Sequence, residues 1–387
     1  MKKTPRLLLA SLIFGLIGVG KAHAQSSVTM YGILDAGLSY LKTSDGDRYT
    51  LQNGTIYGNR WGLRGSEDLG GGLRAIFQVE SGFQIGTGKS SQGSRLFGRQ
   101  SFVGLSSSRW GTVDAGRMYE PIVDLVHPLT ADGSYGSVVF ATPGDVDNND
   151  FSSRVSNAIK YVSPIINGLK FEALVAPGGV AGSLGQGYTW STAAVYSTGP
   201  FRIAAGYHDS VNANSTNGGL RTGWTSSTDD GQFEGGSINS AYETAHVLGI
   251  GQAAVQYDSG PWQIGVGYSN ARYTADGEST FANTETYNTG RAYAFYRITP
   301  SATVGMGYIY TSAKGDASAH YNDVSAGAFY SVSKLTELYA VATFQRASGV
   351  QRTADGGLQA ARADISSYGI DGTGTQTIVV VGMYHSF

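Results

Sequence analysis

Residues 28–41, VTMYGILDAGLSYL, decide the fold of this chain because apolar side chains recur at every second position. In an extended chain one face carries Val28, Met30, Leu34, Leu38 and Tyr40, and the other carries Thr29, Tyr31, Asp35 and Ser39. This period of two predicts a β-strand with one dry face and one wet face. Residues 73–83, LRAIFQVESGF, repeat the pattern, with Leu73, Ala75, Phe77, Val79 and Phe83 opposite Arg74, Gln78 and Glu80.

Short turns alternate with long polar loops along the rest of the chain. Turns are expected near 66–70, 106–111, 163–168, 197–200, 258–261, 298–301 and 331–335, and loops near 42–54, 84–94, 119–153, 177–187, 210–245, 274–288, 314–321 and 347–375. Together they would join 16 strands, with short turns at one rim and long loops at the other, as in bacterial outer-membrane barrels. Closure leaves no unpaired backbone edge in the lipid. We therefore predict an all-β fold, a transmembrane 16-stranded antiparallel β-barrel.

The amino terminus has the pattern of a secretory signal peptide. Residues 1–24 combine Lys2, Lys3 and Arg6 with an apolar run and an Ala22-His23-Ala24 cleavage site. The expected division is a signal peptide over 1–24 and one barrel domain over 25–387. Beyond the signal peptide no run approaches the ~20 apolar residues of a membrane helix.

Composition excludes several classes of function. Removing residues 1–24 takes away four cationic residues and no acid, so 23 Lys and Arg face 29 Asp and Glu, a net charge of about −6. A mildly acidic chain lacks the clustered excess of Lys and Arg that nucleic-acid binding requires. The absence of cysteine rules out disulfides and thiolate metal sites.

The sequence resembles the Gram-negative trimeric porins of the neisserial and beta-proteobacterial type over the whole mature chain, most strongly in its first third. The segments that carry the resemblance are SSVTMYGILDAGL (26–38), NRWGLRGSEDLGGGLRAIFQVESGF (59–83), FGRQSFVGLSSSRWGTVDAGR (97–117), SNAIKYVSPIINGLKF (156–171) and VGMYHSF (381–387). One departure is that the third loop lacks the Pro-Glu-Phe-Gly-Gly stretch of some relatives.

The resemblance implies a general diffusion porin of the outer membrane. It would be a homotrimer in contact with outer-membrane lipid and lipopolysaccharide, with a third loop that folds into the lumen as an eyelet. Small hydrophilic solutes and ions would pass through it. Insertion would rely on recognition of the terminal aromatic residue, Phe387, by the barrel-assembly machinery.

A diffusion pore depends on the charges at its narrowest point. Strand parity puts Arg60 and Arg64 opposite Trp61 and Leu63, and it puts Arg154, Ser156 and Lys160 opposite Val155, Ile159 and Tyr161. An arginine facing mid-bilayer lipid would cost ~2–4 kcal/mol, which favours the lumen for Arg99 as well. By resemblance Arg60, Arg99 and Arg154 match the basic wall of the family's constriction. Arg74 is a further lumen candidate, and Arg117 is ambiguous because it shares parity with Val113 and Ala115.

The third loop would supply acids opposite this wall. The candidates are Asp124, Asp132, Asp145, Asp147 and Asp150. A field from loop acids to wall arginines would hinder apolar solutes, and three close arginines predict a modest anion preference. The alternative is that the arginines are ordinary solvated lumen residues and the aspartates are turn formers.

Other motifs fail on inspection, and we expect no cofactor, no metal and no catalysis. Residues 86–90, GTGKS, would need glycine at Phe83 to form a phosphate loop. Residues 145–156 begin like a calcium loop but lack its glycine and its terminal glutamate. The five histidines that follow the signal peptide are dispersed: His127, His208, His246, His320 and His385. A barrel enzyme, a plugged adhesin or structural barrel, and a soluble secreted β-sandwich remain as alternatives.

Overall fold

The computed structural model describes residues 26–43, 46–135, 138–229, 231, 236–366 and 373–387. The expected signal peptide lies outside the described residues. Within the described part, no helix is long and apolar enough to cross a membrane.

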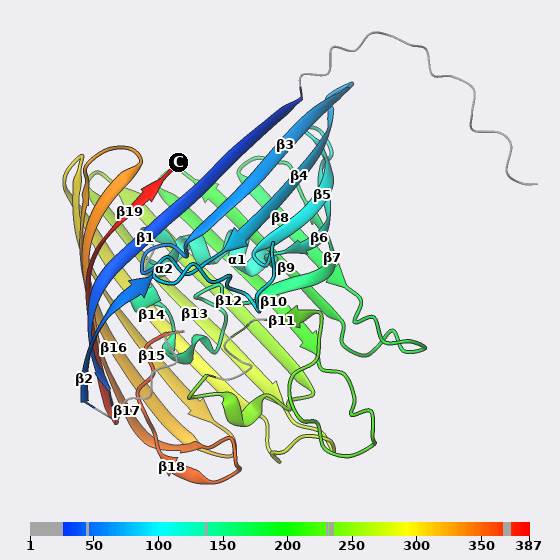
Figure 1. The fold of residues 1–387 in the computed structure, drawn as a ribbon, viewed down its shortest axis with the longest axis vertical. Helices are drawn as coiled ribbons and strands as arrows, with labels where there is room; N and C mark the ends of the chain where they lie inside the picture. The colour runs from blue at the N-terminus through cyan, green and yellow to red at the C-terminus, as the bar shows by residue number, and fades with distance from the viewer. Residues whose placement is uncertain (1–25, 44–45, 136–137, 230, 232–235, 367–372) are drawn as a thin grey trace, which may run out of the picture.

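Sixteen antiparallel strands form one closed wall (Figure 1). They are β1 (Ser27–Thr43), β3 (Arg60–Gly70), β4 (Leu73–Gly82), β5 (Gln100–Ser107), β6 (Gly111–Met118), β7 (Arg154–Val162), β8 (Leu169–Ala176), β9 (Thr189–Thr198), β10 (Phe201–Val211), β12 (Val247–Ser259), β13 (Trp262–Thr274), β14 (Glu285–Thr299), β15 (Ala302–Lys314), β16 (Ser318–Ser331), β17 (Thr336–Arg352) and β19 (Thr375–Ser386). Three further strands, β2 (Gly46–Asn53), β11 (Thr228–Asp229) and β18 (Leu358–Ala360), belong to the loops. The predicted 16-stranded barrel is confirmed.

The barrel closes between its first and last strands. Strand β1 pairs with β19 from Ile33 opposite Ser386 to Lys42 opposite Thr377. The backbones of Gly32 and Phe387 exchange two N–H···O hydrogen bonds of 3.1 Å each. The pairing therefore leaves no open edge between these two strands.

Alternation divides each strand between the outside and the lumen, as the sequence predicts. On β1, Leu38 is 72% exposed whereas Asp35 is fully buried. On β19, Val381 points outward and Val380 is buried. The outside is consequently an apolar band suited to lipid.

Strand β7 departs from the predicted parity. Asn157 has a φ of +56° there, and the pairing of β6 with β7 shifts register between Gly116 and Met118. This irregularity is a β-bulge, which inserts one residue and reverses the faces beyond it. Val155 is buried as a result, although Ile159 remains outward, so Arg154 and Lys160 do not share one uninterrupted face.

The turns and loops follow the predicted order with shifted ends. Strand β3 continues through Gly70, so the first turn is Gly71-Gly72 and not residues 66–70. Residues 314–321 are not a long loop, because β15 and β16 leave only 315–317 between them. In Figure 1 the long loops lie at the lower rim and the short turns at the upper rim.

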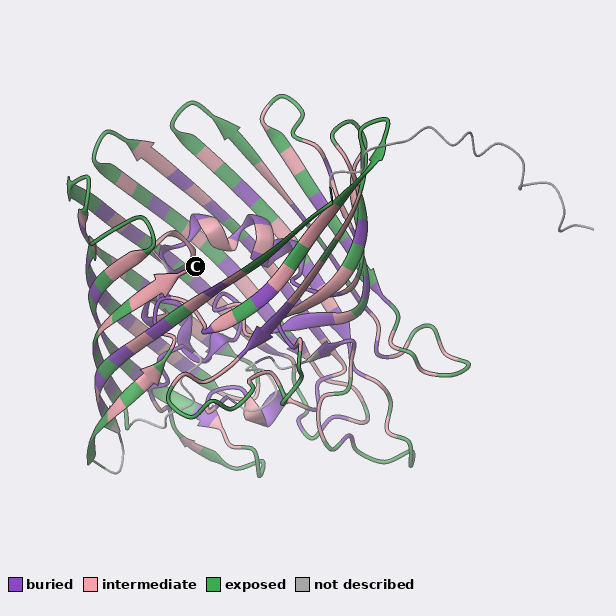
Figure 2. Ribbon diagram, turned by 45° about the horizontal axis from the view of Figure 1, so that its top comes forward, coloured by how far each residue is buried: buried purple, intermediate pink, exposed green. Residues whose placement is uncertain are grey.

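The third loop, residues 119–153, folds into the barrel. Its short helices are α1 (Pro121–Leu125), η1 (His127–Leu129), α2 (Ala131–Tyr135), η2 (Val138–Phe140) and η3 (Pro143–Asp145). They lie inside the wall and are largely buried (Figure 2). The fifth loop also contributes a short helix, η5 (Ser240–Tyr242), packed in the largest buried apolar cluster.

Candidate functional site

The third loop crosses the lumen and is attached to the wall near both of its ends. At its start, the Glu120 carboxylate contacts the His208 ring of β10 and accepts a 2.7 Å hydrogen bond from Asn148 of the same loop. In the middle, the Val139 carbonyl accepts hydrogen bonds from the Ser325 hydroxyl of β16 at 2.8 Å and from the Thr343 hydroxyl of β17 at 2.6 Å. These bonds fix the loop's position across the channel.

The far attachment is a buried ion pair. The Asp147 carboxylate pairs with Arg291 of β14 and also accepts a hydrogen bond from the Ser269 hydroxyl of β13. Both ends of the pair are nearly inaccessible to water, so removing one partner would leave an uncompensated buried charge. The pair therefore holds the loop firmly against the wall opposite β6 and β7.

Three predicted arginines meet around Tyr119 at the start of the third loop. Arg99, which directly precedes β5, and Arg154, at the start of β7, each donate a 2.8 Å hydrogen bond to the Tyr119 hydroxyl. Arg60, at the start of β3, interacts electrostatically with both of the other arginines. Strand ends that are far apart in the sequence thus bring these cations to one place.

Glu80 provides the main counter-charge in this cluster. Its carboxylate forms a 2.7 Å ion pair with Arg99 and accepts a 2.9 Å hydrogen bond from the Tyr31 hydroxyl. The Nε atoms of Arg60 and Arg154 are buried without a hydrogen-bond partner in the described part of the chain. The other nitrogens of Arg154 donate hydrogen bonds to the Tyr119 hydroxyl and the Ser152 carbonyl, and Arg60 interacts electrostatically with Glu80. Three guanidinium groups in one cluster raise the local positive potential.

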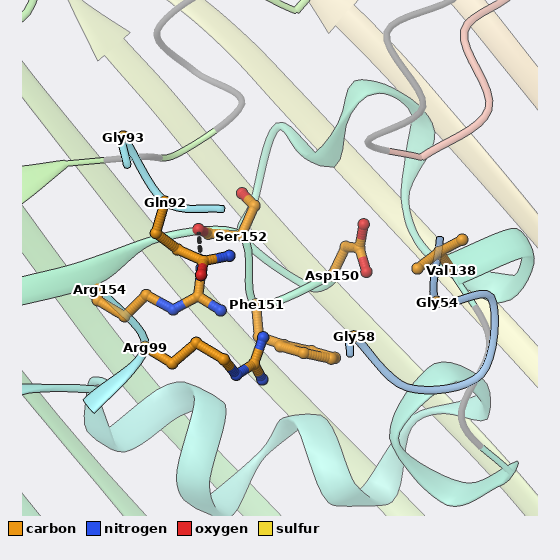
Figure 3. A pocket seen from close by; sticks show the side chains of 10 residues that line it. All are labelled: Gly54, Gly58, Gln92, Gly93, Arg99, Val138, Asp150, Phe151, Ser152 and Arg154. Atoms are coloured by element: carbon orange, nitrogen blue, oxygen red, sulfur yellow. Dashed lines mark hydrogen bonds between the residues drawn. The ribbon is translucent and has the colours of Figure 1, made fainter. Parts of the chain in front are cut away.

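Two clefts flank Phe151 beside this cluster. The Arg99 cleft, of about 390 Å³, is lined by Arg99, Arg154, Asp150 and Phe151 together with glycines of the first and second loops (Figure 3). The Arg60 cleft, of about 230 Å³, is lined by Arg60, Tyr119, Phe151 and residues of α1 and its neighbours. Phe151, near the end of the third loop, lines both clefts.

The five predicted acids lie in different surroundings, and three of them line the clefts beside the arginines. Asp124 pairs with Lys160 of β7 at 2.5 Å, and Asp132 contacts His127 of its own loop at 2.7 Å. Asp147 is directed to the far wall, and Asp145 is fully buried. Asp150 lines the Arg99 cleft with Arg99 and Arg154, and Asp124 and Asp132 line the Arg60 cleft with Arg60.

Asp145 and Asp150 influence each other inside the loop. The Asp145 carboxylate accepts a 2.7 Å hydrogen bond from the Asp150 backbone N–H. Burial raises the pKa of the Asp145 carboxyl, and the nearby Asp150 carboxylate raises it further. Asp145 thus lies inside the loop and lines neither the Arg99 cleft nor the Arg60 cleft.

Of the two remaining arginines, Arg74 lies away from the cluster and Arg117 borders it, because Arg117 interacts electrostatically with Arg154. Arg74 is exposed beside the Gly71-Gly72 turn, six residues along β4 from Glu80, which is about 20 Å in a strand. Arg117 donates hydrogen bonds to the Gly98 carbonyl at 2.8 Å and to the Ser156 hydroxyl at 2.7 Å, beside the β6–β7 bulge.

Several residues of the site were not predicted. Glu80 lies on the wet face of its strand by sequence alternation, so parity alone could have nominated it. Tyr119, Phe151 and Arg291 carry no such signal, because loop conformation and long-range contacts position them. In the described part of the chain, no group of three or more His, Asp or Glu side chains is arranged to hold a metal ion.

Comparisons with known proteins agree on one family. A family model described as Gram-negative porin matches residues 11–350. An outer membrane porin protein of Bordetella pertussis is 39% identical over 187 residues, which cover 44% of this chain and 47% of that protein. The major outer membrane protein P.IB of Neisseria lactamica is 26% identical over 358 residues, which cover 89% of this chain and 95% of that protein. The first of these alignments thus spans about half of the relative's length.

Solved structures show the same fold. An anion-selective porin from Comamonas acidovorans superposes with a TM-score of 0.70 at 22% identity, covering 94% of this chain and all of that one. OmpT of Vibrio cholerae in its trimer form superposes with a TM-score of 0.64 at 15% identity, covering 94% of this chain and 99% of that one. At these identities the match concerns the architecture of the barrel.

Proposed function

Because this chain belongs to the Gram-negative porin family, we propose that it is a passive outer-membrane channel for ions and small hydrophilic solutes, with a modest preference for anions. Members of this family are channels of the bacterial outer membrane and not enzymes. The proposal concerns the solutes and the ion preference of this particular chain.

The observation that carries the anion preference is the meeting of Arg60, Arg99 and Arg154 beside the third loop. Glu80 offsets Arg99 and Asp124 is paired with Lys160, so the guanidinium groups of Arg60 and Arg154 supply the positive charge that a passing anion would meet, against Asp132 and Asp150 in the same two clefts. A narrow passage with low-dielectric walls concentrates such a field and raises the local concentration of counter-ions. The Comamonas acidovorans porin of the same architecture is described as anion-selective, which is consistent with this proposal.

Purified protein in planar lipid bilayers tests the function directly. Discrete, ohmic conductance steps are expected in potassium chloride. In a salt gradient the reversal potential should shift toward the equilibrium potential of chloride. Strong cation selectivity would contradict the role of the arginines. Folded protein that inserts without conducting would favour the plugged barrel.

We also propose that the functional unit is a homotrimer in contact with lipid and lipopolysaccharide. The apolar outward band supplies surface for both lipid and neighbouring copies. Conductance steps arriving in threes and a cross-linked trimer on a denaturing gel are expected. Conductance steps that arrive only one at a time would contradict this assembly.

Export and insertion complete the proposal. Residues 1–24 would be removed, so mass spectrometry of the mature protein should find Gln25 at its amino terminus. The barrel-assembly machinery would recognise Phe387, whose ring is partly exposed on the last strand. Phe387→Ser should lower the amount of barrel in the outer membrane, compared with Tyr330→Ser as a control on another outward aromatic position.

A further inference from the structure

The walls of the Arg60 cleft are unlike those of a purely hydrophilic pore. Its apolar side is formed by Ile56 and Tyr57 of the first loop and by Tyr119, Val123 and Phe151 of the third. Its polar side is formed by Arg60, Asp124, His127 and Asp132. Its volume of about 230 Å³ is below the roughly 300–1,000 Å³ that is usual for sites of drug-sized ligands. An occupant of this cleft would therefore be small and largely apolar.

Arg60 has a charge available for such an occupant. Its Nε is buried without a hydrogen-bond partner in the described structure, and its guanidinium lies 5.9 Å from the centre of the Tyr57 ring. The acids at the edge of the cleft are already engaged, since Asp124 pairs with Lys160 and Asp132 contacts His127. A guanidinium presents a planar pair of donors that matches a carboxylate.

Phe151 forms the apolar side of the cleft in a strained backbone conformation. Its φ is +44°, a left-handed value that is unfavourable for a bulky residue. Its ring packs against the rings of Tyr119 and His127, at 6.1 and 4.8 Å between centroids. Strain of this kind persists where the surroundings fix a residue, and it is frequent at ligand-binding positions.

We propose that the Arg60 cleft is a binding subsite for small carboxylates that carry a planar apolar ring. The carboxylate would be held by Arg60, and the ring would pack against Phe151 and Tyr57 in the edge-to-face or offset arrangements that aromatic pairs prefer. The inference rests on the proposed channel function and adds a class of solute to it. Small inorganic anions would use the arginine charge alone, whereas aryl carboxylates would also use the apolar wall.

The test measures block of the chloride current by benzoate in planar bilayers at pH 7. Acetate has the carboxylate without the ring, and benzyl alcohol has the ring without the charge. Benzoate is expected to reduce the single-channel current at millimolar concentrations, with an apparent dissociation constant roughly tenfold lower than that of acetate. Benzyl alcohol at the same concentrations is expected to have no effect.

Three variants assign the block to the cleft. Arg60→Gln should weaken benzoate block roughly tenfold, since it removes the charge but keeps a polar side chain. Phe151→Ala should weaken benzoate block roughly threefold or more and leave the weak effect of acetate unchanged. Arg202→Gln is the matched control, because Arg202 lies near the short-turn rim, paired with Asp258, and its removal should not alter block.

The outcomes separate this inference from the channel function. Equal effects of benzoate and acetate on the unmodified protein would overturn the subsite, even if the chloride conductance is as proposed. Unchanged benzoate block in conducting Arg60→Gln or Phe151→Ala channels would overturn it as well. Absence of any chloride conductance would instead reject the channel. If Phe151→Ala does not fold, the milder Phe151→Leu should weaken benzoate block in the same direction.

Discussion

Reversing the charge of Arg60 is the sharpest test of the ion preference. Arg99 and Arg154 both donate hydrogen bonds to Tyr119, whereas the Nε of Arg60 has no partner in the described structure. Arg60→Glu therefore disturbs the fewest contacts. It changes the local charge by two units.

The expected magnitude follows from Coulomb's law. Two unit charges 4 Å apart interact by ~1 kcal/mol in water and by ~4 kcal/mol at an effective dielectric constant of 20. A change of two charges thus alters the energy of a passing ion by about 2–8 kcal/mol before screening by salt. Since ~1.4 kcal/mol corresponds to a factor of ten, we expect the anion-to-cation permeability ratio to fall at least about tenfold.

The assay is the reversal potential in a tenfold gradient of potassium chloride at low ionic strength. Arg202→Glu at the turn rim is the control, and its effect should stay below about twofold because the side chain there is open to water. The double variant Arg60→Glu with Arg99→Glu should shift the ratio further, at a cost in stability because Glu80 would face a second carboxylate. A ratio unchanged in conducting Arg60→Glu channels would refute the assignment of Arg60 to the narrowest part of the pore.

Three further predictions concern stability. Asp147→Ala should destabilise the protein by about 3–5 kcal/mol, because Arg291 is then a buried charge without its partner; an unchanged thermal unfolding midpoint would contradict this. The pKa of the Asp276 carboxyl is lowered by its hydrogen bonds with Arg221, which links the fifth and sixth loops. This link should therefore be intact above about pH 4 and weaken only as the pH falls below the ordinary carboxyl range. Hydrogen exchange showing that the two loops separate between pH 7 and 5 would contradict this direction. Gly32→Ala should destabilise the barrel by about 1–3 kcal/mol, because an added Cβ would lie 2.4 Å from the terminal phenylalanine ring and 2.7 Å from a backbone oxygen; an unaltered midpoint in detergent would show that the seam can relax.

The wall of this protein was predictable because each strand lies between two fixed environments. Leu38 and Asp35 lie on opposite faces of β1 and need different surroundings. The lipid suits Leu38 on the outer face, and the lumen suits Asp35 on the inner face. Glycine, proline and polar runs then indicate where the chain reverses. The ends of the turns shifted by a few residues, as at Gly70, because hydrogen bonding can extend a strand beyond its alternating pattern.

The site was predictable only in part. Arg60, Arg99 and Arg154 were placed together by resemblance, and the structure brings them within reach of Tyr119. Parity failed at β7, since a single residue, Asn157, inserts a bulge that no alternation reveals. The partner of Asp147 lies 144 residues away on β14, and a contact of this range has no local signature.

The third loop has a mechanical consequence beyond narrowing the channel. A hollow cylinder has no packed centre, so its cross-section flattens easily when the surrounding bilayer presses on it. The bonds of Glu120 to β10, of Asp147 to β14 and of Val139 to β16 and β17 tie separate sectors of the wall to one crosspiece. The same segment that crosses the lumen therefore braces the tube and keeps its opening round.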